Sequence, residues 1–111
     1  MRKTGKLDYI EMAATTGTMD HVKAFYSSAF GWTFTDYGPD YAAFDEGLEG
    51  GFQAQVPAKP LPILYSEELE ATLRAVEEAG GTIVKPIFSF PGGRRFHFTD
   101  PAGNELAVWG E

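Results

Sequence analysis

Hydrophobic and polar positions follow the same order in the two halves of the chain. In the first half, Leu7–Ala14 alternates as a strand does, and Met19–Gly31 then places apolar residues at helical spacing and ends in glycine. Three further strand patterns follow, at Trp32–Thr35, Tyr41–Asp45 and Gly51–Val56. The sequence therefore predicts a βαβββ unit over about residues 7–56.

The second half repeats this order. Leu61–Tyr65 predicts a strand, and Glu67–Gly81 predicts a helix for which Ser66 is placed as the N-terminal cap. Three more strands are predicted at Thr82–Ser89, Arg95–Thr99 and Glu105–Trp109. We therefore predict an α+β fold, a single domain over residues 1–111 made of two tandem βαβββ modules, the second spanning about residues 61–110. Equivalent positions of the two modules are expected to meet around one shared cavity.

The two halves can be aligned by matching the glycines that end their helices and by matching their last two strands. When the helix-end glycines are matched, the first strand and helix correspond at a shift of about 50 residues, so Glu11 corresponds to Leu61. When the last two strands are matched, the shift grows to about 54 residues, so Gln53 corresponds to Ala107. The additional residues fall in the loop at Phe88–Gly93.

Charge and composition exclude several classes of binding partner and of chemistry. A net charge of -7 repels phosphate backbones, so no nucleic-acid partner is expected. The absence of cysteine removes disulfides, thiol nucleophiles and thiolate metal sites. The sequence has neither a run of about eighteen apolar residues nor an apolar segment of the signal-peptide kind near Met1–Ile10. We therefore expect no membrane partner and a cytoplasmic location.

Three groups of residues carry a family resemblance. They are Phe25-Tyr26 with Phe30-Gly31-Trp32, Ala79-Gly80-Gly81, and the segment from Phe98 to Asn104, which reads Phe-Thr-Asp-Pro-Ala-Gly-Asn. On these motifs the chain resembles the vicinal oxygen chelate superfamily, which includes glyoxalase I, bleomycin-resistance proteins and extradiol dioxygenases. The resemblance implies paired modules that form a curved mixed sheet around a cup-shaped cavity, and a homodimer.

The resemblance also implies where a metal would bind. Metal-using members place His, Glu or Gln near the centre of the first and last strand of each module, and these four positions correspond here to Glu11, Gln53, Leu61 and Ala107. Leu61 and Ala107 have no lone pair to offer a cation, and a catalytic divalent ion needs about three protein ligands. We therefore expect no cofactor and a metal-free site, with a divalent metal as the alternative.

Strand alternation selects the side chains of the cup. If Phe96 and Phe98 face the core, then Arg95 and His97 face the cavity. The same logic gives the full set of expected ligand-binding residues: Tyr9, Glu11, Gln53, Gln55, Arg95, His97 and Trp109. Polar groups ringed by aromatic side chains are typical of a small-molecule pocket.

Several roles stay open at this point. Glu11 is expected either to act in catalysis or ligand contact, or to pair structurally with Arg95 or His97. For His97 alone, a satisfied strand histidine is favoured over a functional role. Gln53 and Gln55 fit exposed strand positions as well as the cavity, and His21 is expected to be exposed. Among the aromatic side chains, six phenylalanines are expected in the core, and Trp32 and Trp109 at a pocket wall or dimer contact. The six are Phe25, Phe30, Phe44, Phe52, Phe96 and Phe98.

Three functions fit these residues. The first is a small-molecule-binding protein of the superfamily with a degenerate, metal-free site. The second is a glyoxalase-like lyase or isomerase, using either an altered metal site of Glu11, Gln53 and His97 or Glu11 as acid and base. The third is an interaction module whose cup is filled by its own side chains or by a partner segment.

Overall fold

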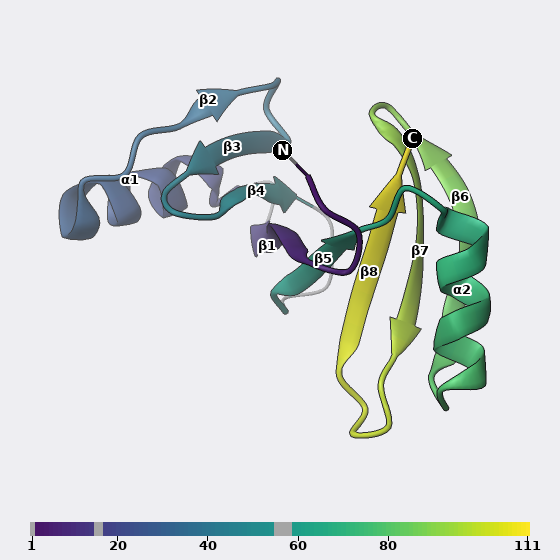
Figure 1. Ribbon diagram of the computed structural model, residues 1–111. Coiled ribbons are helices and arrows are strands. Elements are labelled where there is room, and N and C mark those ends of the chain that lie inside the picture. The colour runs from purple at the N-terminus through teal and green to yellow at the C-terminus, as the bar shows by residue number, and fades with distance from the viewer. Residues whose placement is uncertain (1, 15–16, 55–58) are drawn as a thin grey trace. The chain divides into compact units, whose positions relative to one another are not determined.

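A computed structural model describes residues 2–14, 17–54 and 59–111 of the chain (Figure 1). Its elements follow the predicted order. The first half contains β1 (Leu7–Ala14), α1 (Met19–Phe30), β2 (Thr35–Asp36), β3 (Tyr41–Asp45) and β4 (Glu49–Ala54). The second half contains β5 (Leu61–Tyr65), α2 (Leu69–Glu78), β6 (Thr82–Phe90), β7 (Gly93–Thr99) and β8 (Glu105–Gly110). The α+β fold of two βαβββ modules is thereby confirmed.

The chain divides into two compact units. One consists of Tyr9–Pro60, which we call the first module, and the other of Met1–Asp8 with Leu61–Glu111, which we call the second module. The segment before β1 belongs to the second module through backbone hydrogen bonds. The Gly5 N–H donates to the Tyr65 carbonyl at 2.9 Å, and the Tyr65 N–H donates to the Lys6 carbonyl at 3.2 Å.

The sheet of the first module has the strand order β2-β3-β4-β1. Strand β4 runs antiparallel to β3 and parallel to β1, with Met12 opposite Phe52 and Glu11 opposite Gly51. Met12 and Phe52 face α1, where they join a core with Val22. Residues of the alternate set, such as Glu11 and Gln53, therefore lie on the other side of this sheet. We call that side the open face of the module.

Two phenylalanines of α1 that were predicted to lie in the core are exposed. Phe25 and Phe30 were expected to be buried, but they are 59% and 65% exposed. Val22 and Tyr26 instead form the side of α1 that packs against the sheet. The helix ends at Gly31, whose φ of 74° turns the chain back, so that the Trp32 N–H donates to the Tyr26 carbonyl at 3.3 Å.

That turn also decides the place of Trp32. Its ring stacks on Tyr26 with centroids 4.7 Å apart and lies 4.8 Å from the ring of Phe44, which is buried. Trp32 is half-buried, and its ring packs against the hydrophobic core of the first module, a contact that the sequence did not indicate.

The sheet of the second module has the order β5-β8-β7-β6. Strand β8 is parallel to β5 and antiparallel to β7. Helix α2 covers one face (Figure 1), and Leu69 packs there against Phe96 and Val108. The prediction of Ser66 as the N-terminal cap is wrong, because the helix begins at Leu69 and Glu68 takes the cap position. The Ser66 hydroxyl instead accepts a hydrogen bond from the Glu68 N–H at 3.0 Å in the turn before the helix. The face away from α2 is the open face of the second module.

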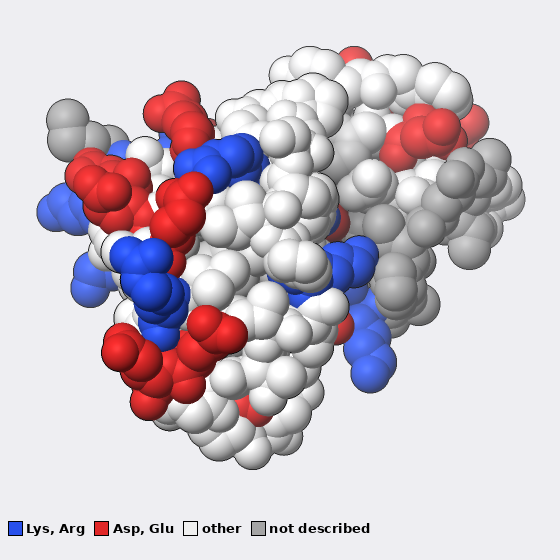
Figure 2. Space-filling model, turned by 90° about the vertical axis from the view of Figure 1, so that its right-hand side faces the viewer, with Lys and Arg blue, Asp and Glu red and all other residues white. Residues whose placement is uncertain are grey.

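The surface of the second module mixes charges of both signs. Glu70 on α2 and Arg94 on β7 form an ion pair at 2.5 Å. Figure 2 shows acidic side chains beside basic ones on this side of the molecule. Neither helix of the described residues has the length and apolar character needed to cross a membrane.

Candidate functional site

Strand register supports the correspondence between the two modules. Ala13 lies opposite Gln53 in the β1-β4 pair, and Ile63 lies opposite Ala107 in the β5-β8 pair. These two pairs are related by the shifts of about 50 and 54 residues that the sequence gives. Leu61 and Ala107 therefore hold in the second module the strand positions that Glu11 and Gln53 hold in the first.

The residues at these positions do not fit a four-ligand metal site. Glu11 is buried at 8% exposure and Gln53 is half-buried, and both carry oxygen donors on the open face. Leu61 and Ala107 offer only hydrocarbon. Within either module, the described residues contain no group of three His, Asp or Glu placed to hold a metal ion. The donor set therefore supplies two oxygen ligands where a catalytic ion needs about three.

The predicted site residues divide between the modules. Tyr9, Glu11 and Gln53 belong to the first module. Strand alternation places Arg95, His97 and Trp109 on the open face of the second, because Phe96 and Val108 face α2. Gln55 lies outside the described residues. His21 is exposed, as expected.

His97 is the most unusual ionisable group of the second module. Its side chain is 4% exposed, Nδ1 lies 3.0 Å from Oε2 of Glu105, and its ring lies 5.8 Å from that of Phe88. Among the residues that the structure describes, Nε2 is buried without a hydrogen-bond partner. Burial lowers the pKa of His97 below its usual 6.5, against an upward effect of the Glu105 hydrogen bond. The neutral imidazole thus donates from Nδ1 to the carboxylate and keeps the lone pair of Nε2.

We expect this histidine to make stability fall in mild acid. Because its pKa is lower in the folded chain, the unfolded chain binds more protons below about pH 6.5. The contribution is therefore complete above that pH and is lost as the pH falls toward the folded pKa. Urea unfolding at about pH 7.5 and 5.5 should show a smaller loss of stability for His97→Gln than for the natural chain. His21→Gln, at an exposed histidine, should show the same loss as the natural chain.

Arg95 and Trp109 lie opposite each other on β7 and β8, among aromatic rings. The guanidinium carbon of Arg95 is 5.5 Å from the ring centre of Phe88 and 5.6 Å from that of Phe90. The indole Nε1 of Trp109 donates to Asp8 at 2.9 Å. Both side chains are thus held in place on the open face by contacts within the second module.

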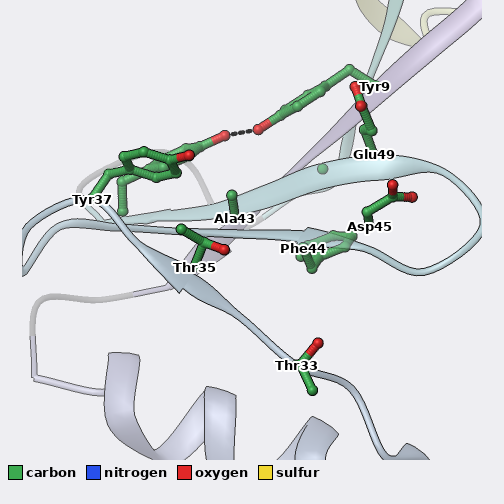
Figure 3. A pocket seen from close by; sticks show the side chains of 10 residues that line it. Tyr9, Thr33, Thr35, Tyr37, Ala43, Phe44, Asp45 and Glu49 are labelled. Carbon is green, nitrogen blue, oxygen red and sulfur yellow. Dashed lines mark hydrogen bonds between the residues drawn. The ribbon is translucent and has the colours of Figure 1, made fainter.

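The open face of the first module carries a hollow of about 430 Å³ over β2, β3 and β4 (Figure 3). Tyr9, Tyr37 and Tyr41 line it, and the hydroxyls of Tyr9 and Tyr41 are hydrogen-bonded to each other. Thr33, Thr35, Asp45 and Glu49 are among its other lining residues.

Of this hollow, the sequence prediction included only Tyr9. The missed signal is the alternation of β3, which puts Tyr41, Ala43 and Asp45 on the same face as Gln53. Tyr41 lies directly opposite Gln53, and Asp45 lies opposite Glu49.

Two tandem βαβββ modules, each with one covered and one open sheet face, define the class of protein to which this chain belongs. Residues 6–108 match the Glyoxalase/Bleomycin resistance protein/Dioxygenase superfamily, and the chain is a member of it. The resemblance seen in the sequence motifs is therefore confirmed.

Solved structures share the fold at low sequence identity. A superfamily member from Vibrio splendidus 12B01 has a TM-score of 0.75 at 13% identity, over 96% of this chain and 100% of that chain. Methylmalonyl-CoA epimerase from Mycobacterium tuberculosis has a TM-score of 0.68 at 13% identity, over 99% of this chain and 90% of that one. The Mn(II)-bound glyoxalase from Novosphingobium aromaticivorans has a TM-score of 0.70 at 20% identity, over 99% of this chain and 40% of that chain. None of the curated proteins compared with the chain matches it significantly.

Proposed function

We propose that this chain binds a small organic molecule on the open faces of its modules and does so without a catalytic divalent metal. The observation that carries the proposal is the shared strand register, by which Leu61 and Ala107 take the positions equivalent to Glu11 and Gln53. Substitution of hydrocarbon at two of four ligand positions removes the Lewis acid while leaving polar and aromatic contact groups.

The remaining groups suit ligand binding. Glu11 and Gln53 supply oxygen atoms, His97 supplies a neutral ring nitrogen, and Arg95 and Trp109 supply charge and flat aromatic surface. On each open face, a few polar groups beside apolar and aromatic surface can give a small ligand its orientation and specificity. The proposal includes a homodimer, as the superfamily often forms, which sedimentation of the purified chain would check.

The experiment compares ligand binding with and without chelator. A library of small organic molecules is screened by thermal shift on protein treated with EDTA, and each ligand found is titrated by calorimetry with and without EDTA. The proposal predicts equal dissociation constants in the two conditions. Ligands that bind only after a divalent ion is restored would contradict it.

One observation favours a second candidate, an isomerase or lyase that moves a proton without a metal. The buried Nε2 of His97 carries a lone pair, and the Glu105 carboxylate fixes the ring through Nδ1. Glu11 is the alternative acid and base of this candidate. Turnover that is unchanged in both Glu11→Gln and His97→Gln would exclude it.

A further inference from the structure

We infer that the hollow of the first module is a subsite for a small organic cation, a ligand carrying an ammonium or similar group beside an aromatic or aliphatic portion. The inference rests on the proposed function and adds the charge class of the ligand. The size of the hollow supports the inference first, because its volume of about 430 Å³ lies in the range of pockets that bind small molecules.

The second support is the arrangement of the three tyrosine rings. The hydrogen bond between the hydroxyls of Tyr9 and Tyr41, marked by the dashed line in Figure 3, fixes two of them. The ring of Tyr37 lies 6.4 Å from that of Tyr41 at an angle of 50° and is 67% exposed. All three tyrosines line the hollow, and the negative face of an aromatic ring attracts a cation.

The third support is a backbone that makes room for this arrangement. A Cβ atom at Gly51 would collide with the ring and hydroxyl of Tyr41. Gly51 therefore allows the Tyr41 ring to lie across β4, beside the strand that carries Tyr9. The absence of a side chain at Gly51 thus lets the Tyr41 ring keep its place in the lining of the hollow.

The fourth support is the sign of the charges around the hollow. Asp45 and Glu49 are partners across β3 and β4 and lie next to each other at one end of it (Figure 3). No lysine or arginine is among its lining residues in the described part of the chain. An anionic ligand would meet the Asp45 carboxylate, whereas an ammonium group would be attracted to it and to the rings.

Three probes of similar size and different charge test the inference: 2-phenylethylammonium, 2-phenylethanol and phenylacetate. Calorimetric titration of EDTA-treated protein should show the ammonium binding at least roughly tenfold more tightly than the alcohol, and no binding of phenylacetate. Equal binding of the ammonium and the alcohol, binding of phenylacetate, or binding of none of the three would overturn the inference. The proposed function fails separately, if the ligands found by screening need a divalent ion.

Substitutions inside and outside the hollow test whether 2-phenylethylammonium binds there. Asp45→Asn should weaken 2-phenylethylammonium binding by roughly fivefold or more, whereas Asp40→Asn, at an exposed carboxylate outside the lining, should change it less than about twofold. Tyr37→Phe should keep the affinity and Tyr37→Ala should lower it, because the ring face and not the hydroxyl attracts the cation. Equal effects of Asp45→Asn and Asp40→Asn would overturn the inference. They would mean that the cation is attracted by the net charge of -7 of the whole chain and not by the hollow.

Discussion

Replacing Phe96 with alanine is expected to lower the free energy of unfolding by about 3–5 kcal/mol. Phe96 is 0% exposed and packs with Leu69 and Val108 between the sheet and α2, so the shorter side chain leaves a cavity. In a domain of this size the midpoint of thermal unfolding should fall by roughly 10–20 °C. Calorimetric and urea unfolding measure both quantities.

The matched control is Phe25→Ala, which removes the same atoms from α1. Phe25 is 59% exposed, and its substitution should cost less than about 1 kcal/mol. The comparison tests the side assignment of β7, because a buried Phe96 requires Arg95 and His97 to face the other way. Similar losses for the two variants would contradict the assignment of both phenylalanines.

Supplying the two missing donor groups is expected to create metal affinity. The double variant Leu61→His with Ala107→Glu places an imidazole and a carboxylate at the positions equivalent to Glu11 and Gln53. Its affinity for Zn²⁺ or Ni²⁺ should exceed that of the natural chain by roughly a hundredfold or more, because the open face of the second module gains two donor side chains, one of them directly opposite His97. Competition calorimetry against a chelator of known affinity measures the gain.

The controls are the two single variants, each adding one donor group. Because Ala107 is 0% exposed, its replacement by glutamate carries a risk of misfolding, which circular dichroism checks. Leu61→His leaves Ala107 intact and should show an intermediate gain. A folded double variant and a folded Leu61→His variant with no gain over the natural chain would contradict the assignment of these positions.

Much of the fold could be predicted from local pattern. The bounds of β1, β3 and β5 agree with the predicted strands at both ends, because alternation within each strand and turn residues around it point to the same limits. The α1 helix ends where Gly31 adopts a positive φ, as its position after the apolar run indicates. These features depend on neighbouring residues alone.

The inner side of α1 could not be predicted in the same way. The aromatic residues of α1 lie on more than one side of the helix, so helical spacing does not decide which of Phe25, Tyr26 and Phe30 is buried. The sheet decides it, since Tyr26 lies 5.3 Å from the ring of Phe52 while Phe25 and Phe30 remain exposed. The contact of Trp32 with the core could not be predicted for a related reason, because it depends on the turn at Gly31.

The sequence could predict which sheet face carries His97, but not which side chain contacts it. Alternation placed His97 on the open face, as the register of β7 and β8 shows, but it did not indicate the contact of His97 with Glu105. The contact with Glu105 depends on two side chains reaching diagonally across neighbouring strands. The tyrosine hollow likewise depends on the pairing of β2, β3 and β4, which joins residues distant in the sequence.

The metal content of the purified natural chain shows whether it holds a catalytic divalent ion. Protein purified without a histidine tag would be measured by elemental analysis before and after incubation with zinc, nickel, manganese and iron(II), then desalting. We expect much less than one equivalent of any of these metals per chain. About one tightly held ion per chain would contradict this expectation and would favour a metal-dependent lyase or dioxygenase.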